Sequence, residues 1–104
     1  MGKMIPNLNK QQATRLIREI ALDSRNVFIT THARVRMGER KISRQMVFEC
    51  LRHGRIERQP EPNTMKGSLE CLMEHHVAGE TIGVLAAIPE DNPGIIVVTV
   101  MHVK

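Results

Sequence analysis

The sequence predicts an α+β fold, in which two or three N-terminal helices pack on an antiparallel sheet of three to five strands. Three observations lead to this prediction. Amphipathic helical patterns occur only in the first half of the chain, apolar β-branched runs fill the second half, and short turns join those runs consecutively. A length of 104 residues is typical of one domain, so we treat residues 1–104 as a single unit.

The first predicted helix covers about residues 9–23. Asn9 can cap it, and Gln12 can return a hydrogen bond in a capping box. Apolar residues then recur at helical spacing, at Ala13, Leu16, Ile17 and Ile20. A short β-rich run over 27–30 comes next and predicts a strand.

Two short helices are expected after this strand. Thr31 can cap the first helix and Gly38 can end it. Its apolar side is formed by Ala33 and Met37. Ser43 can cap the second helix, and Gly54 follows its end. The residues expected to be buried on this second helix are Met46, Val47, Cys50 and Leu51.

The second half of the chain predicts strands. Residues 55–58 can form a short strand, but Pro60 and Pro62 predict a loop over 59–67. Three apolar runs then predict an antiparallel meander, at Leu69–Ala78, Ile82–Ile88 and Ile95–Val103. The last run is apolar on both faces, so we expect both of its faces to be partly covered.

Composition narrows the class of protein. Apolar residues make up 41% and charged residues 25% of the chain, as in folded globular domains. No apolar run approaches the ~18 residues of a membrane span, and the N-terminus lacks a secretory signal. Two cysteines make no disulfide framework, so we expect a cytoplasmic protein that does not bind membranes. Without Trp or Tyr, the chain lacks the aromatic platforms on which many single-strand binders stack bases.

Charge is unevenly distributed along the chain. Residues 1–58 hold 13 Lys and Arg against 5 Asp and Glu, a net charge of +8. Residues 59–104 hold 2 against 6, a net charge of −4. A basic half on a small domain favours a polyanionic partner, nucleic acid first, although a solubilising charged surface has the same composition.

The densest group of chemically useful side chains is His32, Arg36 and Arg40. If residues 31–40 are helical, these three lie four residues apart and share one face. Arginines one turn apart repel each other, a cost that an anion such as phosphate between them would offset. The alternative is a solvated basic face.

Three further histidines occur on the predicted strands. His75 and His76 point to opposite faces, and a simple register places Gly83 between one of them and His102. Two histidines at one sheet edge can supply a base and an acid near neutral pH, although polar residues at strand ends are also common.

Motifs for metals and cofactors are weak or missing. Cys50 and His53 have a helical i, i+3 spacing, but Cys50 belongs to an apolar stripe and is more simply a core residue. The chain has no phosphate-binding glycine loop and no nucleophile elbow. We therefore expect no metal site and no cofactor.

The segment from Thr31 to Ser43, THARVRMGERKIS, resembles a known signature. This signature is the T-x-H-A-x-x-R-M-x-x-R-x-I-S run of a widespread family of small bacterial proteins of unknown function. Here the threonine stands directly before His32, or two residues before it if Thr30 is counted. The flanking residues that fit the same family are Val47, Leu51, Gly54, Arg55, Ile56 and the run Ile96–Val100. The resemblance covers roughly residues 27–102.

That family is similar to the RelE, BrnT and MqsR ribonuclease toxins, which implies a RelE-like fold. Members of this superfamily cleave RNA without a metal, usually as toxins paired with an antitoxin. The resemblance therefore implies RNA and a cognate antitoxin as partners. It marks His32, Arg36 and Arg40 as the family's polar positions and, more weakly, Thr99.

Together these observations predict a metal-independent endoribonuclease of the toxin type. His32 would act as base or acid, and Arg36 and Arg40 would hold the scissile phosphate. A second proton-transfer group would be His75 or His102. The residues expected to contact RNA elsewhere are Arg34, Lys41, Arg44, Arg52, Arg55 and Thr99.

Two other functions remain open. Helices at about 31–38 and 43–53 can mimic the helix-turn-helix of a non-catalytic nucleic-acid-binding regulator. In that arrangement Arg44, Gln45, Glu49 and Arg52 would face a groove. The third possibility is a protein-interaction module, antitoxin-like or immunity-like, that binds an acidic partner.

Overall fold

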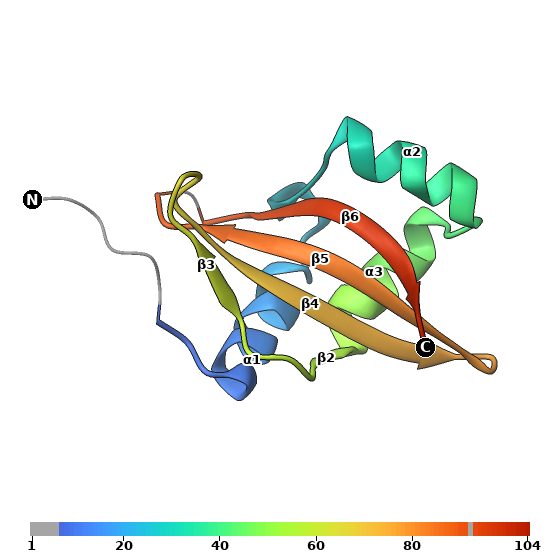
Figure 1. Ribbon diagram of the computed structural model, residues 1–104, viewed down its shortest axis with the longest axis horizontal. Helices are drawn as coiled ribbons and strands as arrows, with labels where there is room; N and C mark the ends of the chain where they lie inside the picture. Colours follow the sequence, from blue (N-terminus) through green and yellow to red (C-terminus); the bar gives the residue numbers. More distant parts are fainter. Residues whose placement is uncertain (1–6, 92) are drawn as a thin grey trace, which may run out of the picture.

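Three helices pack on a six-stranded sheet, so the predicted α+β class is confirmed. The computed structural model describes residues 7–91 and 93–104. Figure 1 labels the elements in chain order. Their bounds are α1 (Lys10–Ile20), a 3₁₀ turn η1 (Ser24–Asn26), β1 (Val27–Ile29), α2 (Thr31–Arg40), α3 (Arg44–His53), β2 (Arg55–Ile56), β3 (Glu61–Asn63), β4 (Ser68–Val77), β5 (Glu80–Pro89) and β6 (Ile95–Val103).

The sheet is larger than predicted and is mixed, in the order β1-β6-β5-β4-β2. The meander β4-β5-β6 forms its centre as expected, with antiparallel pairing throughout. β1 adds to β6 in parallel, with Phe28 opposite Ile96. The prediction of a purely antiparallel sheet was therefore wrong, because the partner of β1 lies far along the chain.

Pro60 and Pro62 had predicted a loop over residues 59–67, but part of this range forms a strand. Within this range β3 pairs antiparallel with β4, and Pro62 lies opposite Leu69. Proline has no N–H to donate, and a strand at the edge of a sheet tolerates this on its outer side. The prolines therefore marked a strand at the edge of the sheet and not a loop alone.

The core lies between one face of the sheet and the helices α1 and α3, which lie behind the sheet in Figure 1. Met73, Val84 and Val100 point into this layer from the three central strands and are fully buried. We call the opposite side of the sheet the open face. α2 runs beside β6, along the edge of the sheet beyond β1.

The helix caps follow the sequence closely, but the helix ends do not. Asn9 and Ser43 cap α1 and α3 as predicted, each in a capping box. Thr30, one residue before the predicted cap, caps α2. This helix also continues past Gly38 and ends at Lys41, whose φ of 56° lies in the left-handed region. Burial of the next residue, Ile42, holds the chain in this turn.

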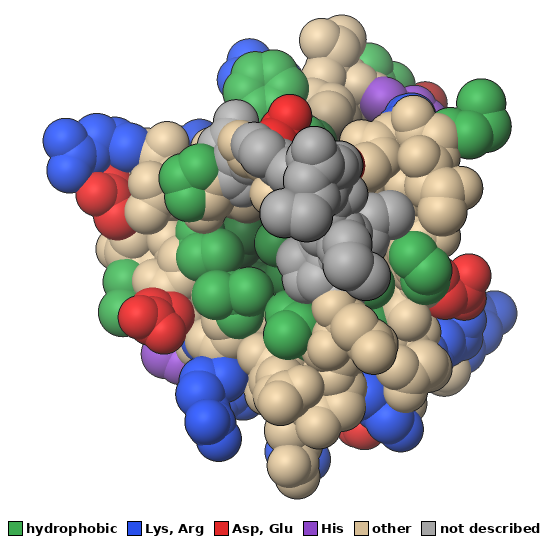
Figure 2. All heavy atoms as spheres, turned by 90° about the vertical axis from the view of Figure 1, so that its left-hand side faces the viewer, with side chains coloured by type: hydrophobic (Ala, Val, Ile, Leu, Met, Phe, Trp, Pro, Cys, Tyr) green, Lys and Arg blue, Asp and Glu red, His purple; other side chains and the backbone are tan. Residues whose placement is uncertain are grey.

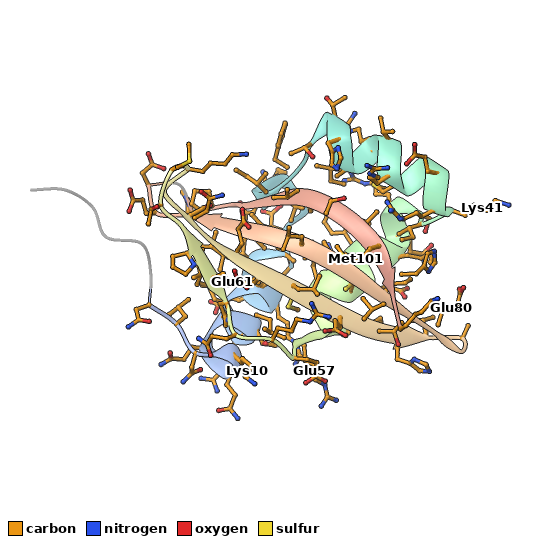
Figure 3. The ribbon with its side chains drawn as sticks, in the orientation of Figure 1. Lys10, Lys41, Glu57, Glu61, Glu80 and Met101 are labelled. Carbon is orange, nitrogen blue, oxygen red and sulfur yellow. The ribbon has the colours of Figure 1, made fainter. Side chains whose placement is uncertain are left out.

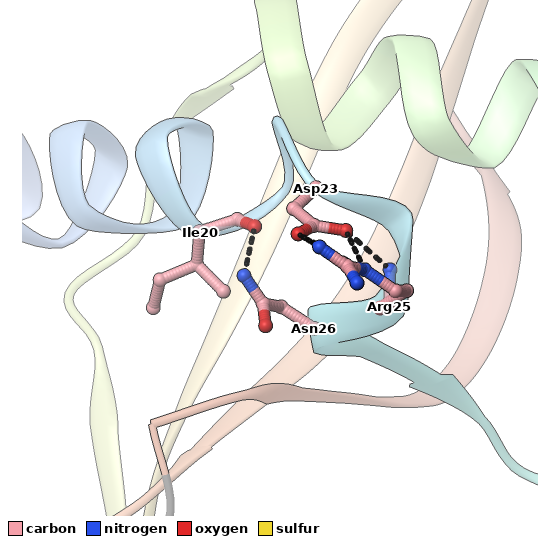
Figure 4. A network of polar contacts seen from close by, with 4 residues as sticks. All are labelled: Ile20, Asp23, Arg25 and Asn26. Carbon is pink, nitrogen blue, oxygen red and sulfur yellow. Dashed lines mark hydrogen bonds and ion pairs between the residues drawn. The ribbon is translucent and has the colours of Figure 1, made fainter.

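α1 ends at Ile20, three residues before its predicted end, because Asp23 starts a new turn. The Asp23 carboxylate accepts hydrogen bonds from the backbone N–H and the guanidinium of Arg25 (Figure 4). These bonds lower the pKa of Asp23 to about 2. No helix in the described part of the chain is long and apolar enough to span a membrane.

A candidate active-site groove beside helix α2

A groove on the open face of the sheet contains His32. Its volume is about 350 Å³. The strands contribute an apolar floor, whereas the polar groups come from the start of α2 and from the β3–β4 hairpin. The residues that define this His32 groove are Thr30, His32, Lys66, Ser68, Glu70, Ala87, Pro89, Ile96 and Val98.

Thr30 joins the strand to the helix at this groove. Its hydroxyl accepts a hydrogen bond from the N–H of Ala33, at 3.0 Å, and so caps α2. The same hydroxyl lies 3.0 Å from the carbonyl of Val97, to which it donates. Ala33 is fully buried below. These contacts fix the first turn of α2, and therefore His32, against β6.

The opposite wall of the groove carries Glu70 and Lys66, which the sequence analysis missed. Asn63 donates to the Glu70 carboxylate at 3.0 Å, and its own carbonyl oxygen accepts from the Lys66 N–H at 3.1 Å. One amide side chain therefore orients both the carboxylate and the turn that bears the ammonium group. The sequence could have indicated Glu70, because Ser68 and Glu70 are polar residues two positions apart in a predicted strand region and residues at that spacing share a face.

The predicted stripe on α2 exists, and its members have different surroundings. His32 is exposed at the groove. One turn later, Arg36 makes an ion pair with Glu39 at 2.7 Å. Two turns later, the backbone carbonyl of Arg40 lies 2.9 Å from Nε2 of His102. Met37, which is half-buried, anchors the helix together with Ala33, as predicted.

His75 and His102 lie away from the His32 groove. The register pairs Ile82 with both of them, and Ile82 is buried, so the predicted space beside Gly83 does not exist. His75 faces the helix layer, where its ring centroid lies 6.3 Å from that of His53 on α3. The structure thus separates His75 from His32 by the sheet itself, and it places His102 at the far end of α2.

The residues predicted to contact RNA do not form one surface. Arg34 is exposed on α2, and Lys41 is exposed just after this helix and points away from its end (Figure 3). Arg55 lies on β2, at the opposite edge of the sheet from α2. At the end of the molecule shown in Figure 2, Lys and Arg side chains are spread around the outline. Thr99 is half-buried on β6, opposite Leu85.

Two of the predicted contacts, Arg44 and Arg52, flank one ring on α3. Their guanidinium carbons lie 4.8 and 4.9 Å from the centre of the Phe48 ring. Arg52 also donates to the carbonyl of Ala21, at 2.7 Å. This hydrogen bond joins α3 to the C-terminal end of α1, so Arg52 has a structural role that its charge alone did not indicate.

Cys50 and Cys71 are free and buried, as predicted. Burial raises the pKa of each thiol to about 12. Cys50 contacts the carbonyl of Met73, at 3.2 Å, instead of pairing with His53. Within residues 7–91 and 93–104, no three His, Cys, Asp or Glu side chains converge as a metal site.

Neither the curated proteins nor the solved structures contain a match to this chain. Residues 29–102 match the family described as Domain of unknown function (DUF4258). This segment includes α2, the His32 groove and every predicted site residue. The chain therefore belongs to the DUF4258 family of domains of unknown function.

Proposed function

We propose that this protein is a metal-independent endoribonuclease that cleaves single-stranded RNA in the His32 groove. The observation that carries the proposal is the convergence of an imidazole, a carboxylate and an ammonium group, from His32, Glu70 and Lys66, on one groove. The resemblance to RelE-like toxins supports the same activity and adds a cognate antitoxin as a proposed partner.

The cations beside the groove suit a phosphodiester. Lys66 lies at the groove itself, and Arg36 continues from His32 along α2. Glu39 holds the Arg36 guanidinium, which reduces the side-chain entropy lost when phosphate binds. Positive charge at this position stabilises the phosphorane, on which negative charge builds.

Cleavage needs two proton transfers. The 2′-oxygen attacks phosphorus while Glu70 takes its proton, and the bond to the 5′-oxygen breaks while His32 donates a proton to it. The products are a 2′,3′-cyclic phosphate and a 5′-hydroxyl. Asn63 orients the Glu70 carboxylate for this role, and the Thr30 cap orients His32.

The roles of the two groups are separated by a substrate with a bridging 5′-sulfur. Sulfur leaves without a proton, so His32→Ala should cleave this RNA nearly as fast as the parent protein does. On ordinary RNA the same variant should be about 10²–10⁴-fold slower. Glu70→Gln should be slow on both substrates. Equal losses for His32→Ala on both substrates would contradict the assignment of His32 as the acid.

The matched control for these variants is His76→Ala. His76 is exposed near the other end of the open face, where Nδ1 lies 3.0 Å from the Thr81 hydroxyl. Its loss should leave cleavage unchanged. All assays contain EDTA, so activity that requires an added divalent metal would refute the metal-independent mechanism.

A matched pair of arginine variants tests the RNA-binding surface. Arg36→Ala should lower the rate of RNA cleavage by about 10²–10³-fold, as expected when one contact to the charge of the transition state is lost. Arg55→Ala removes an exposed arginine on the opposite edge of the sheet and should have little effect. A folded parent protein that binds RNA without cleaving it would favour the regulator instead.

A further inference from the structure

We propose that Phe28 is a stacking platform for a nucleobase of the RNA whose backbone lies in the His32 groove. This inference rests on the proposed function and adds a base-binding subsite to it. Phe28 belongs to β1, at the edge of the sheet. It lies just before the residues that match the family, so the family assignment does not account for it.

The exposure of Phe28 is unusual for this chain. The sequence contains two Phe and no Trp or Tyr. Phe48 is 6% exposed in the helix layer, whereas Phe28 is 63% exposed. Phe28 is therefore the one exposed side chain among the Phe, Tyr and Trp residues of the protein, and it offers a ring face that the sequence alone did not indicate.

A hollow beside Phe28 shares two of its lining residues with the His32 groove. This Phe28 hollow has a volume of about 180 Å³. Pro89 and Ile96 line both the hollow and the groove, and Ile96 lies opposite Phe28 in the sheet. Thr30, at the groove, follows Phe28 by two residues, about 6.8 Å of extended chain. An RNA strand in the groove therefore brings its neighbouring base to the ring.

The Phe28 hollow also carries a cationic side chain. Arg25 lines it and is held in place by the Asp23 carboxylate, at 2.8 Å, as Figure 4 shows. The ammonium group of Lys66 lies at the adjoining groove. Cations beside an apolar, aromatic floor bind the phosphates of a single strand while its bases stack.

The test uses a 2′-O-methyl RNA dodecamer, which cannot be cleaved, and an abasic ribose-phosphate dodecamer. Phe28→Ala should weaken binding of the RNA by about 5- to 150-fold, the range for loss of one stacked base. Binding of the abasic strand should be unchanged. Leu22→Ala removes another exposed apolar side chain, outside both the hollow and the groove, and should change neither affinity. Because Phe28 is exposed, its loss should not lower the melting temperature.

Phe28→Trp gives a direct signal, because the variant contains a single indole. The RNA dodecamer should quench its fluorescence, and the abasic strand should not. Equal affinity of Phe28→Ala and the parent protein for RNA would overturn the platform while leaving the ribonuclease intact. So would association of the protein through Phe28, seen as dimers that Phe28→Ala abolishes. A parent protein that binds no RNA would remove both the platform and the proposed function.

Discussion

The junction at Thr30 predicts how strongly the site depends on one hydroxyl group. Thr30→Val keeps the shape of the side chain but removes the cap of α2 and the hydrogen bond to Val97. The lost cap is worth about 1 kcal/mol, and the lost hydrogen bond about 0.5–1.5 kcal/mol. The free energy of unfolding should therefore fall by about 1.5–2.5 kcal/mol, which lowers the melting temperature by about 7–12 °C.

Urea unfolding followed by circular dichroism measures this loss, since the chain has no Trp or Tyr for fluorescence. Thr30→Ser keeps the hydroxyl group and is the matched control. It should retain the cap and lose less than about 1 kcal/mol. Equal stability of the two variants would refute the reasoning. Thr30→Val should also cleave RNA more slowly at temperatures where it is folded, because the first turn of α2 carries His32.

Further predictions concern packing, thiols and salt. Gly83→Ala should lower the free energy of unfolding by about 1–3 kcal/mol, since its Cβ would lie 2.7 Å from the Val103 side chain. A Cβ at Gly38 would meet nothing within 4 Å, so Gly38→Ala should stabilise α2 by about 0.5–1 kcal/mol. Native Cys50 and Cys71 should resist thiol reagents. Because their pKa values are raised on folding, the contribution of the two thiols to stability is constant below about pH 9 and is lost as pH rises towards about 12, which alkaline unfolding measures. RNA affinity should fall linearly in log salt, with a slope of about −0.7 per phosphate, and a flat dependence would exclude phosphate contacts.

The parts of the fold that the sequence predicted are those set by local rules. Capping at Asn9 and Ser43, and the apolar stripes of the helices, depend on residues three or four positions apart. The parallel pairing of β1 with β6 joins residues about two thirds of the chain length apart, such as Val27 and Ile95, so no local pattern indicates it. The loop predicted from Pro62 was wrong for another reason. Proline excludes a central strand but is tolerated in an edge strand such as β3.

The same distinction applies to the candidate site. The spacing of His32, Arg36 and Arg40 was predicted, since a helix fixes it locally. The neighbours of His75 were not, because they depend on the turn between β4 and β5. Ala78 and Gly79, with φ of 52° and 81°, form a two-residue turn that places Ile82 opposite His75. A turn longer by one residue would have placed Gly83 there, so a shift of one position changed the predicted site.

The separation of the histidines explains why the second proton-transfer group should be Glu70. The 2′-oxygen attacks the same phosphorus that the 5′-oxygen leaves, so the base and the acid must both act within a few ångströms of that phosphorus. His102 contacts the carbonyl of Arg40, eight residues beyond His32, and eight residues of helix extend about 12 Å. His75 faces the helix layer. Glu70 lines the same groove as His32, whereas His75 and His102 do not, so we propose Glu70 as the second group.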